Sequence, residues 1–302
     1  MDVLLRKMTE TEIDYWTQFF SDWFFFLSFI FLGFEFLRYI LKKEFNLTLI
    51  GDTITNYLTL YGFLIINAFL IGSLYVFLIY GGYQFAVFDI KNSIGTALIC
   101  IVLADLMYYW EHRFMHRVNI AWATHSVHHS SPYFNISVAY RFGPMDGVWP
   151  LFGGLILVLI GFNPVLVLFS EIIVQLYQTA LHTEAVGKFP RPIETIMNTP
   201  SHHRVHHASN EEYLDTNYGG IFIIWDRLFG TFAEEKTQVI YGLVSPINSI
   251  NPLTVFFHGF TRLYRTIAQA RGGMNKLKYI IAPPDWDAEK IENADNQSKQ
   301  SQ

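Results

Sequence analysis

Ten of the eleven histidines lie between residues 112 and 207, grouped as HRFMH, HSVHH and HHRVHH with one single histidine in LHTE. Spacings of three and four residues recur, and on a helix they place side chains on one face about 5–6 Å apart. Neutral imidazole suits iron, zinc, copper or nickel, so such a pair can bind one ion. The ten are His112, His116, His125, His128, His129, His182, His202, His203, His206 and His207.

The number of these histidines exceeds what one ion uses. A tetrahedral zinc site takes four ligands, and a mononuclear iron triad takes two histidines and a carboxylate. Eight or nine imidazoles therefore predict two metal ions in one histidine-rich site. A carboxylate such as Glu184 could bridge them, but nothing in the chain resembles the Glu-x-x-His pairs of soluble di-iron bundles.

The chemistry expected of such a site depends on its setting. A metal pair at a membrane face can oxidise an unactivated C–H bond of a lipid with O₂, because the metal carries the difficult step. Two ions can also activate water for hydrolysis, but hydrolytic sites usually contain several carboxylates. The alternative from another class is a non-catalytic membrane protein that binds or transports metal. Such histidine tracts are usually of low complexity, whereas these clusters are separated by aromatic sequence.

The composition indicates a membrane protein. Of 302 residues, 51% are hydrophobic and 16% are charged, and mean hydropathy is +0.24; charged residues usually make up about 25%. The formal charge is −5 and the basic residues are scattered, which excludes a nucleic-acid-binding footprint. Cys100 is the one cysteine, so neither an internal disulfide nor a cysteine-based zinc site can form.

Three apolar stretches are long enough to cross a membrane, which takes about 20 residues. They are residues 16–40, 57–83 and 93–110. The apolar stretch 148–181 is interrupted by Asn163-Pro164, and proline ends or kinks a helix. Histidines lie on both sides of this stretch. If they share a site, the stretch must return to the same side of the membrane, which predicts a helical hairpin.

The predicted fold class is an all-α integral membrane protein with about three spanning helices, a helical hairpin and a histidine-rich helical cap that holds the dinuclear site. The excess of Lys and Arg in the short loops places the cap on the cytoplasmic face, at the inner membrane if the chain is bacterial. The predicted domains are residues 1–92, residues 93–260 with the catalytic site, and residues 261–302, which end in a polar, disordered tail.

The histidine motifs resemble those of the fatty acid hydroxylase superfamily, the membrane enzymes that include sterol desaturases. The resemblance is carried by DLMYYWEHRFMH, WATHSVHHSS, LHTE and NTPSHHRVHHASNEEYLDTNYGGIFIIWDRLFGTF, and it extends from Asp105 to Pro252. Within the superfamily, the run from LHTE onwards is similar to the alkylglycerol monooxygenase branch and its bacterial members. We call HRFMH the first histidine box, HSVHH the second and HRVHH (203–207) the third. Arg117 stands where that branch usually has glutamate after the first box.

The resemblance implies a non-haem di-iron centre that hydroxylates a C–H bond of a lipid, an ether lipid in that branch, with O₂ as co-substrate. Desaturation of a sterol or other lipid at the same site is the alternative outcome. Tetrahydrobiopterin and a cytochrome- or ferredoxin-type donor are the candidate reductants. The expected partners are a membrane lipid and an electron donor, and the oligomeric state stays open. The iron ligands implied are His112, His116, His125, His128, His129, His182, His203, His206 and His207.

Metal-bound histidines nearly always donate their other ring N–H to a nearby acceptor. Asp105 precedes His112 by two helical turns and is expected to accept a hydrogen bond from an imidazole of the site. His202 lies just outside the third box and is expected to be auxiliary. The full set of candidates for such supporting roles is Asp105, Glu184, Asp215, Asn217 and His202. His258, alone in FFHGF, is predicted to be structural.

Overall fold

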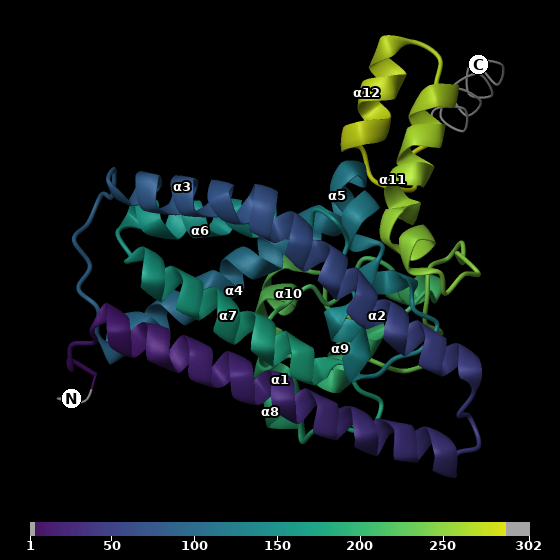
Figure 1. Ribbon diagram of the computed structural model, residues 1–302, viewed down its shortest axis with the longest axis horizontal. Helices are drawn as coiled ribbons and strands as arrows, with labels where there is room; N and C mark the ends of the chain where they lie inside the picture. The colour runs from purple at the N-terminus through teal and green to yellow at the C-terminus, as the bar shows by residue number, and fades with distance from the viewer. Residues whose placement is uncertain (1–3, 288–302) are drawn as a thin grey trace.

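Four long apolar helices run side by side along the length of the molecule (Figure 1). The computed structural model describes residues 4–287, and within them it contains helices and three isolated bridges but no strand. The long helices are α1 (Glu10–Leu41), α2 (Leu47–Ile66), α4 (Ile94–Arg117) and α7 (Pro164–Leu181). Each is long and apolar enough to cross a membrane, so the all-α membrane fold is confirmed.

Helix α2 begins at Leu47, earlier than the predicted start at residue 57. The prediction began later because residues 52–56 include several polar side chains, yet these are buried. Asp52, for example, forms an ion pair of 2.8 Å with Arg141. The helix continues through a π-helical segment, η1 (Asn67–Ile71), into α3 (Gly72–Tyr83). The predicted stretch 57–83 is therefore the second part of a longer helical rod.

Helix α4 is also longer than predicted. The expected stretch 93–110 continues without a break to Arg117, so His112 and His116 lie on the same helix as the apolar residues. Ser93 caps its first turn by accepting a hydrogen bond from the Thr96 backbone N–H. After Val118 the chain turns into the short helix α5 (Asn119–His125). The first two histidine boxes are thus joined by a single tight turn.

The stretch 148–181 forms the predicted helical pair, α6 (Pro150–Ile160) and α7. Gly161 adopts a φ of 130° at the turn, and the Asn163 side chain caps α7 by accepting from Val165 N–H at 2.9 Å. Eleven residues span about 16 Å, which is shorter than the roughly 30 Å hydrocarbon core. Helix α6 is therefore too short to cross on its own, and it packs beside α3 (Figure 1).

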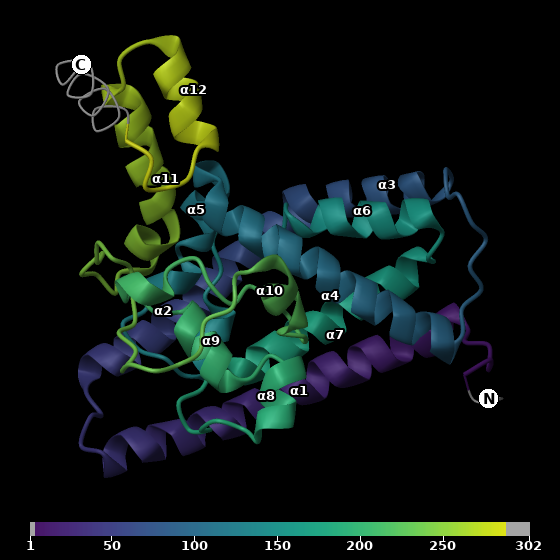
Figure 2. The same cartoon turned by 180° about the vertical axis from the view of Figure 1, so that it is seen from behind.

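Short helices and loops form a cap at one end of the long helices (Figure 2). Its elements are η2 (His128–Ser130), η3 (Ile136–Tyr140), α8 (Arg191–Ile196), α9 (Pro200–His206), η4 (Glu211–Tyr213) and α10 (Ile224–Phe229). Helices α11 (Pro252–Gln269) and α12 (Gly273–Ile281) project sideways from the same end. The part of the predicted disordered tail beyond residue 287 lies outside the described residues.

A buried carboxylate joins the long helices to the cap. Glu35 of α1 is fully buried and was the one awkward charge in its apolar stretch. Its two oxygens accept hydrogen bonds from the Ile136 backbone N–H at 2.8 Å and the Thr183 hydroxyl at 2.6 Å. Because buried polar groups must be paired, this residue fixes two cap segments against α1.

Candidate metal centre

The nine histidines expected as ligands lie together in two adjacent groups. In each group, one ring nitrogen of every histidine lies within 4.8 Å of those of the others. The five-histidine group is His112, His116, His125, His129 and His206. The four-histidine group is His128, His182, His203 and His207. Eight of these side chains are buried and the ninth, His128, is partly buried.

The second and third boxes are each divided between the groups. In the second box, His125 and His129 belong to the five-histidine group and His128 to the other. In the third box the assignment is reversed, with His203 and His207 in the four-histidine group. Residues four apart on a helix share a face, while the residue beside them points about 100° away. The motif His-x2-His-His therefore serves two sites at once.

Backbone carbonyls determine which nitrogen of several rings is protonated. A carbonyl oxygen can only accept, so the Nδ1 atom that contacts it must carry the proton and Nε2 must present a lone pair. The Nδ1–carbonyl pairs are His112 with Tyr218 at 3.0 Å, His128 with Arg141 at 3.3 Å, His182 with Gln178 at 2.9 Å and His206 with Thr216 at 2.9 Å.

Two of the remaining nitrogens face one another without a proton to share. The Nε2 atoms of His128 and His182 lie 3.1 Å apart, although both rings donate through Nδ1. Two lone pairs at this distance repel unless a cation lies between them. Nitrogens about 2.0–2.1 Å from one ion would be about 3.0–3.4 Å apart. The buried Nε2 atoms of His116, His206 and His207 have no protein hydrogen-bond partner either. The donor set therefore fits metal ions.

The protonation of these rings suits the same role. Burial, followed by the nearby imidazoles, lowers the pKa of His125, His129 and His207 well below the ordinary value for histidine. Desolvation disfavours the charged form, so the rings are neutral at physiological pH. Neutral imidazole is the form that binds a metal ion.

Among the expected supporting residues, Asp215 lies nearest an imidazole. Its Oδ1 atom is 3.7 Å from Nδ1 of His116, and its other oxygen accepts from Arg117 at 2.5 Å. Burial alone would raise the pKa of this carboxyl, but His116 and Arg117 outweigh burial and hold the pKa at about 2. Arg117 thus positions the carboxylate beside the first box.

Asp105 does not form the expected hydrogen bond to an imidazole; it supports the site through a neighbouring loop. Its carboxylate accepts from the backbone N–H groups of Ile221 and Phe222 and from the Trp225 indole at 2.8 Å. These bonds fix the loop whose Tyr218 carbonyl binds the Nδ1 proton of His112. Asp105 does lie on the same helix as His112, two turns earlier, but its side chain binds the adjacent loop and not the ring.

The other two candidates also face away from the rings. Glu184 forms an ion pair of 2.9 Å with Arg38 of α1, so its carboxylate is engaged with the long helices. Asn217, at φ 58°, donates to the carbonyls of His202 at 3.1 Å and Ala233 at 2.8 Å. Asn217 therefore ties the loop after the third box to the helix that carries that box.

His202 belongs to neither group. Its Nε2 atom lies 2.9 Å from the Glu194 carboxylate, and its ring packs edge-on against Phe232 with centroids 5.5 Å apart. On α9 it precedes His203 by one residue, and that offset turns it away from the metal groups. Its adjacent position in the sequence does not make it a ligand.

Sequence reasoning missed Arg141, which is the residue that fixes the second box. Its buried guanidinium donates to Asp52 at 2.8 Å, to Asn56 at 2.7 Å and to the Val127 carbonyl at 3.0 Å. Its own carbonyl accepts from His128. The only signals in the sequence were Asp52, shortly before an apolar run, and Arg141, among aromatic residues. Neither indicates a role in the site until the fold shows that the two form an ion pair.

Comparison with known proteins agrees with this geometry. Residues 97–231 match the family model described as fatty acid hydroxylase. The chain is 43% identical over 202 residues to alkylglycerol monooxygenase of Danio rerio, covering 65% of this chain and 43% of that protein. It is 42% identical over 185 residues to the Homo sapiens protein of the same name, covering 60% and 40%.

A bacterial relative is more distant. The chain is 30% identical over 133 residues to ornithine lipid hydroxylase OlsE of Rhizobium tropici, covering 44% of this chain and 40% of that protein. The chain thus spans less than half the length of these curated relatives, and no solved structure matches it significantly. The family match contains all nine clustered histidines. Residues 97–231, a little under half of the chain, thus match the fatty acid hydroxylase family.

Proposed function

We propose that this protein is a membrane-bound, non-haem di-iron monooxygenase that hydroxylates a C–H bond of a lipid, with glycerol ether lipids as the first candidate class. The observation that carries the proposal is the pair of adjacent all-imidazole groups whose Nε2 lone pairs converge. Imidazole suits iron. The relatives named alkylglycerol monooxygenase support the choice of substrate class.

The nine clustered histidines would hold the two ions. When bound, the iron pair supplies the activation of O₂ that oxidation of an unreactive C–H bond requires. The chain's own contribution is to fix the rings: the carbonyls of Gln178, Thr216 and Tyr218 hold their Nδ1 protons. Such partners typically affect metal affinity or activity by about 10–100-fold. The apolar helices bring a lipid substrate to the same protein.

The reaction requires an external reductant. Hydroxylation consumes the C–H bond, one O₂, two electrons and two protons, and it yields the C–OH product and one water. The proposed donor is tetrahydrobiopterin or a cytochrome- or ferredoxin-type protein. We place the cap on the cytoplasmic face, where such donors occur and where the count of Lys and Arg in short loops puts it.

The test is turnover with isotopic oxygen. Membranes containing the protein would be given an alkylglycerol, ¹⁸O₂ and each candidate reductant, and lipid products would be measured by mass spectrometry. Hydroxylation next to the ether oxygen gives an unstable hemiacetal that releases a fatty aldehyde carrying ¹⁸O. The His203→Ala variant should lose this product, and His202→Ala should keep it. Turnover of neither alkylglycerols nor other lipids would contradict the proposal.

Desaturation is a second candidate, because the chain is 26% identical over 160 residues to human lathosterol oxidase. A desaturated product is lighter by two hydrogens and carries no ¹⁸O, so the same measurement separates the two reactions. A metal-binding or transport protein would show exchangeable metal and no O₂-dependent product.

A further inference from the structure

The C-terminal hairpin, α11 with α12, leaves a large apolar surface exposed. Six of its large side chains are between 46% and 74% exposed: Leu253, Phe257, Tyr264, Met274, Leu277 and Ile281. In water, a contiguous surface of this kind is unfavourable and marks a site of protein or membrane contact. The hairpin therefore has a partner that the rest of the cap does not supply.

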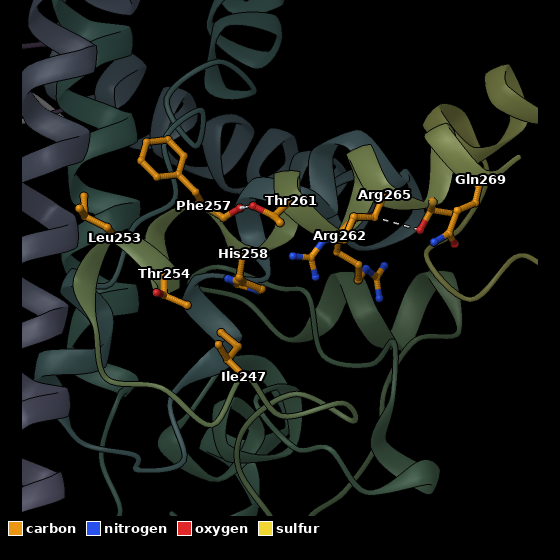
Figure 3. A pocket seen from close by; sticks show the side chains of 10 residues that line it. Ile247, Leu253, Thr254, Phe257, His258, Thr261, Arg262, Arg265 and Gln269 are labelled. Atoms are coloured by element: carbon orange, nitrogen blue, oxygen red, sulfur yellow. Dashed lines mark hydrogen bonds between the residues drawn. The ribbon is translucent and has the colours of Figure 1, made fainter.

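The exposed apolar side chains line one face of each helix. Leu253, Phe257 and Tyr264 are spaced by four and seven residues along α11, which keeps them on one stripe. Figure 3 shows Phe257 and the adjacent His258 among the side chains that line one groove beside α11. On α12, Met274 and Leu277 are three residues apart and Ile281 follows by four, again on one side. Both helices are therefore amphipathic.

The polar side of the hairpin is strongly basic. Residues 252–284 contain no aspartate or glutamate. Arg262 and Arg265 line a groove of about 600 Å³ together with Thr254 and His258 (Figure 3). The five basic residues of the segment are Arg262, Arg265, Arg271, Lys276 and Lys278. Basic side chains beside an apolar stripe are typical of helices that lie on anionic membranes.

Two contacts tie the hairpin to the long apolar helices. A Cβ atom on Gly62, within the charge-free part of α2, would lie 3.2 Å from the Phe256 ring. At the other end of the hairpin, the Ala282 carbonyl accepts from the Asn119 N–H, two residues after α4 ends. Figures 1 and 2 show the hairpin running across the direction of the spanning helices.

We propose that the hairpin lies in the interfacial layer of the bilayer, with its six exposed apolar side chains immersed and its basic side chains against anionic lipid headgroups. Each basic residue near such a surface is attracted to it, and apolar burial adds to the binding. The proposal depends on the membrane placement of the four long helices and not on the oxygenase reaction.

The hairpin also contacts the helix that carries the second histidine box. Gly259 crosses α5 so closely that a Cβ there would lie 2.0 Å from the Ala123 carbonyl oxygen. The His258 ring lies 3.1 Å from the Ser126 hydroxyl, next to His125. An anchored hairpin would therefore fix α5 against the membrane surface.

Spin labels on the full-length protein test the proposal. Cys100 is buried, so single cysteines introduced as Tyr264→Cys, Leu277→Cys and, on the polar side, Gln269→Cys can be labelled selectively. The protein would be placed in nanodiscs of phosphatidylcholine alone or with phosphatidylglycerol. Power saturation then compares collision with O₂, which concentrates in lipid, and with a water-soluble nickel chelate.

In the anionic discs, the labels at 264 and 277 should favour O₂ over nickel, and the label at 269 should favour nickel. The triple variant Arg265→Gln, Arg271→Gln, Lys276→Gln should shift the first two labels towards nickel, with metal content and melting temperature unchanged. Equal immersion in both lipids and in the triple variant would overturn the role of anionic headgroups. Labels at 264 and 277 as open to nickel as the label at 269 would overturn membrane contact altogether and favour a protein partner.

Discussion

The two histidine groups use the same ligand type in different surroundings. Beside the five-histidine group lie Trp122 and Tyr218, with centroids 4.9 and 5.2 Å from the His116 ring, and the Asp215 carboxylate at 3.7 Å. Beside the four-histidine group lies Phe134, 5.1 Å from the His207 ring and stacked on Tyr241 at 4.9 Å.

The ligand type alone does not distinguish the two sites. A carboxylate beside His116 can offset positive charge at the five-histidine group, whereas the buried Phe134 ring keeps water from one side of the other group. The second and third boxes contribute histidines to both groups, so the two sites depend on the same backbone segments. The surroundings would give two bound ions different electrostatics on a shared scaffold.

Removing one ligand from each group should have the largest effect. His129→Ala and His203→Ala each delete an imidazole from a different group, so iron per chain should fall from two towards one, with loss of at least about 10²-fold in activity, at the upper end of supporting-residue effects. Elemental analysis of the purified protein measures the iron, and turnover with ¹⁸O₂ measures the activity.

His202→Ala is the matched control for this pair, because it is adjacent to His203 but faces Glu194. It should retain both ions. If His202→Ala lost as much iron as His203→Ala, the division into two groups would be wrong.

Arg141→Met should weaken both groups together by releasing the second box. It leaves Asp52 buried without its partner, and breaking a buried ion pair in this way costs about 3–5 kcal/mol. Thermal unfolding in detergent should show a lower melting temperature, and iron should fall at both sites. The double variant Arg141→Met, Asp52→Leu removes both charges and should recover part of the stability; no recovery would mean that the hydrogen bond to Val127 matters more.

The features that depend on local spacing along the chain could be predicted from the sequence. Apolar length predicted the long helices, and the interruption at Asn163-Pro164 predicted the pair α6 and α7. The histidine count predicted two ions, and the structure does gather those nine rings in two groups. Their role as ligands stays a prediction that the iron measurements test.

What could not be predicted depends on partners distant in the sequence. Asp52 reads as a helix-ending residue until it meets Arg141, which is why α2 starts earlier than expected. Four of the nine clustered histidines donate to backbone carbonyls, and the sequence does not show which carbonyl will lie beside which ring. Asp105 had the spacing of an imidazole partner, yet tertiary contacts direct it to the 221–225 loop.

Asp215→Asn should affect the five-histidine group alone. It removes the negative charge beside His116 and the ion pair with Arg117, so iron affinity at that group should fall about 10-fold, at the low end for such partners. Competition with a chelator, followed by Mössbauer spectroscopy, would distinguish the two irons. Glu184→Gln is the control, since its carboxylate pairs with Arg38 instead, and equal effects of the two variants would contradict the comparison.

Replacement of His258 should have the smallest effect on stability. This imidazole lies outside both groups and contacts Ser126, between His125 and His128. Its Nδ1 donates to the Val255 carbonyl at 2.7 Å, so Nε2 accepts from the Ser126 hydroxyl. Burial lowers the pKa of His258 below its unfolded value of about 6.5. The folded protein then binds fewer protons than the unfolded chain, so this stability is present above about pH 6.5 and is lost as pH falls below it.

The His258→Gln variant lacks this titration while it keeps a polar side chain near Ser126. Between about pH 7.5 and about pH 5.5, the natural protein should lose up to about 1 kcal/mol more unfolding free energy than the variant. Denaturation at several pH values in detergent measures the difference. The other buried histidines titrate in both proteins and cancel, so parallel curves would mean that the pKa of His258 is the same in the folded and the unfolded protein, which would contradict the prediction. A natural protein that instead gains stability relative to the variant as pH falls would mean that His258 is protonated in the fold. Ser126 would then accept rather than donate, and the hairpin would hold the second box by a charged contact.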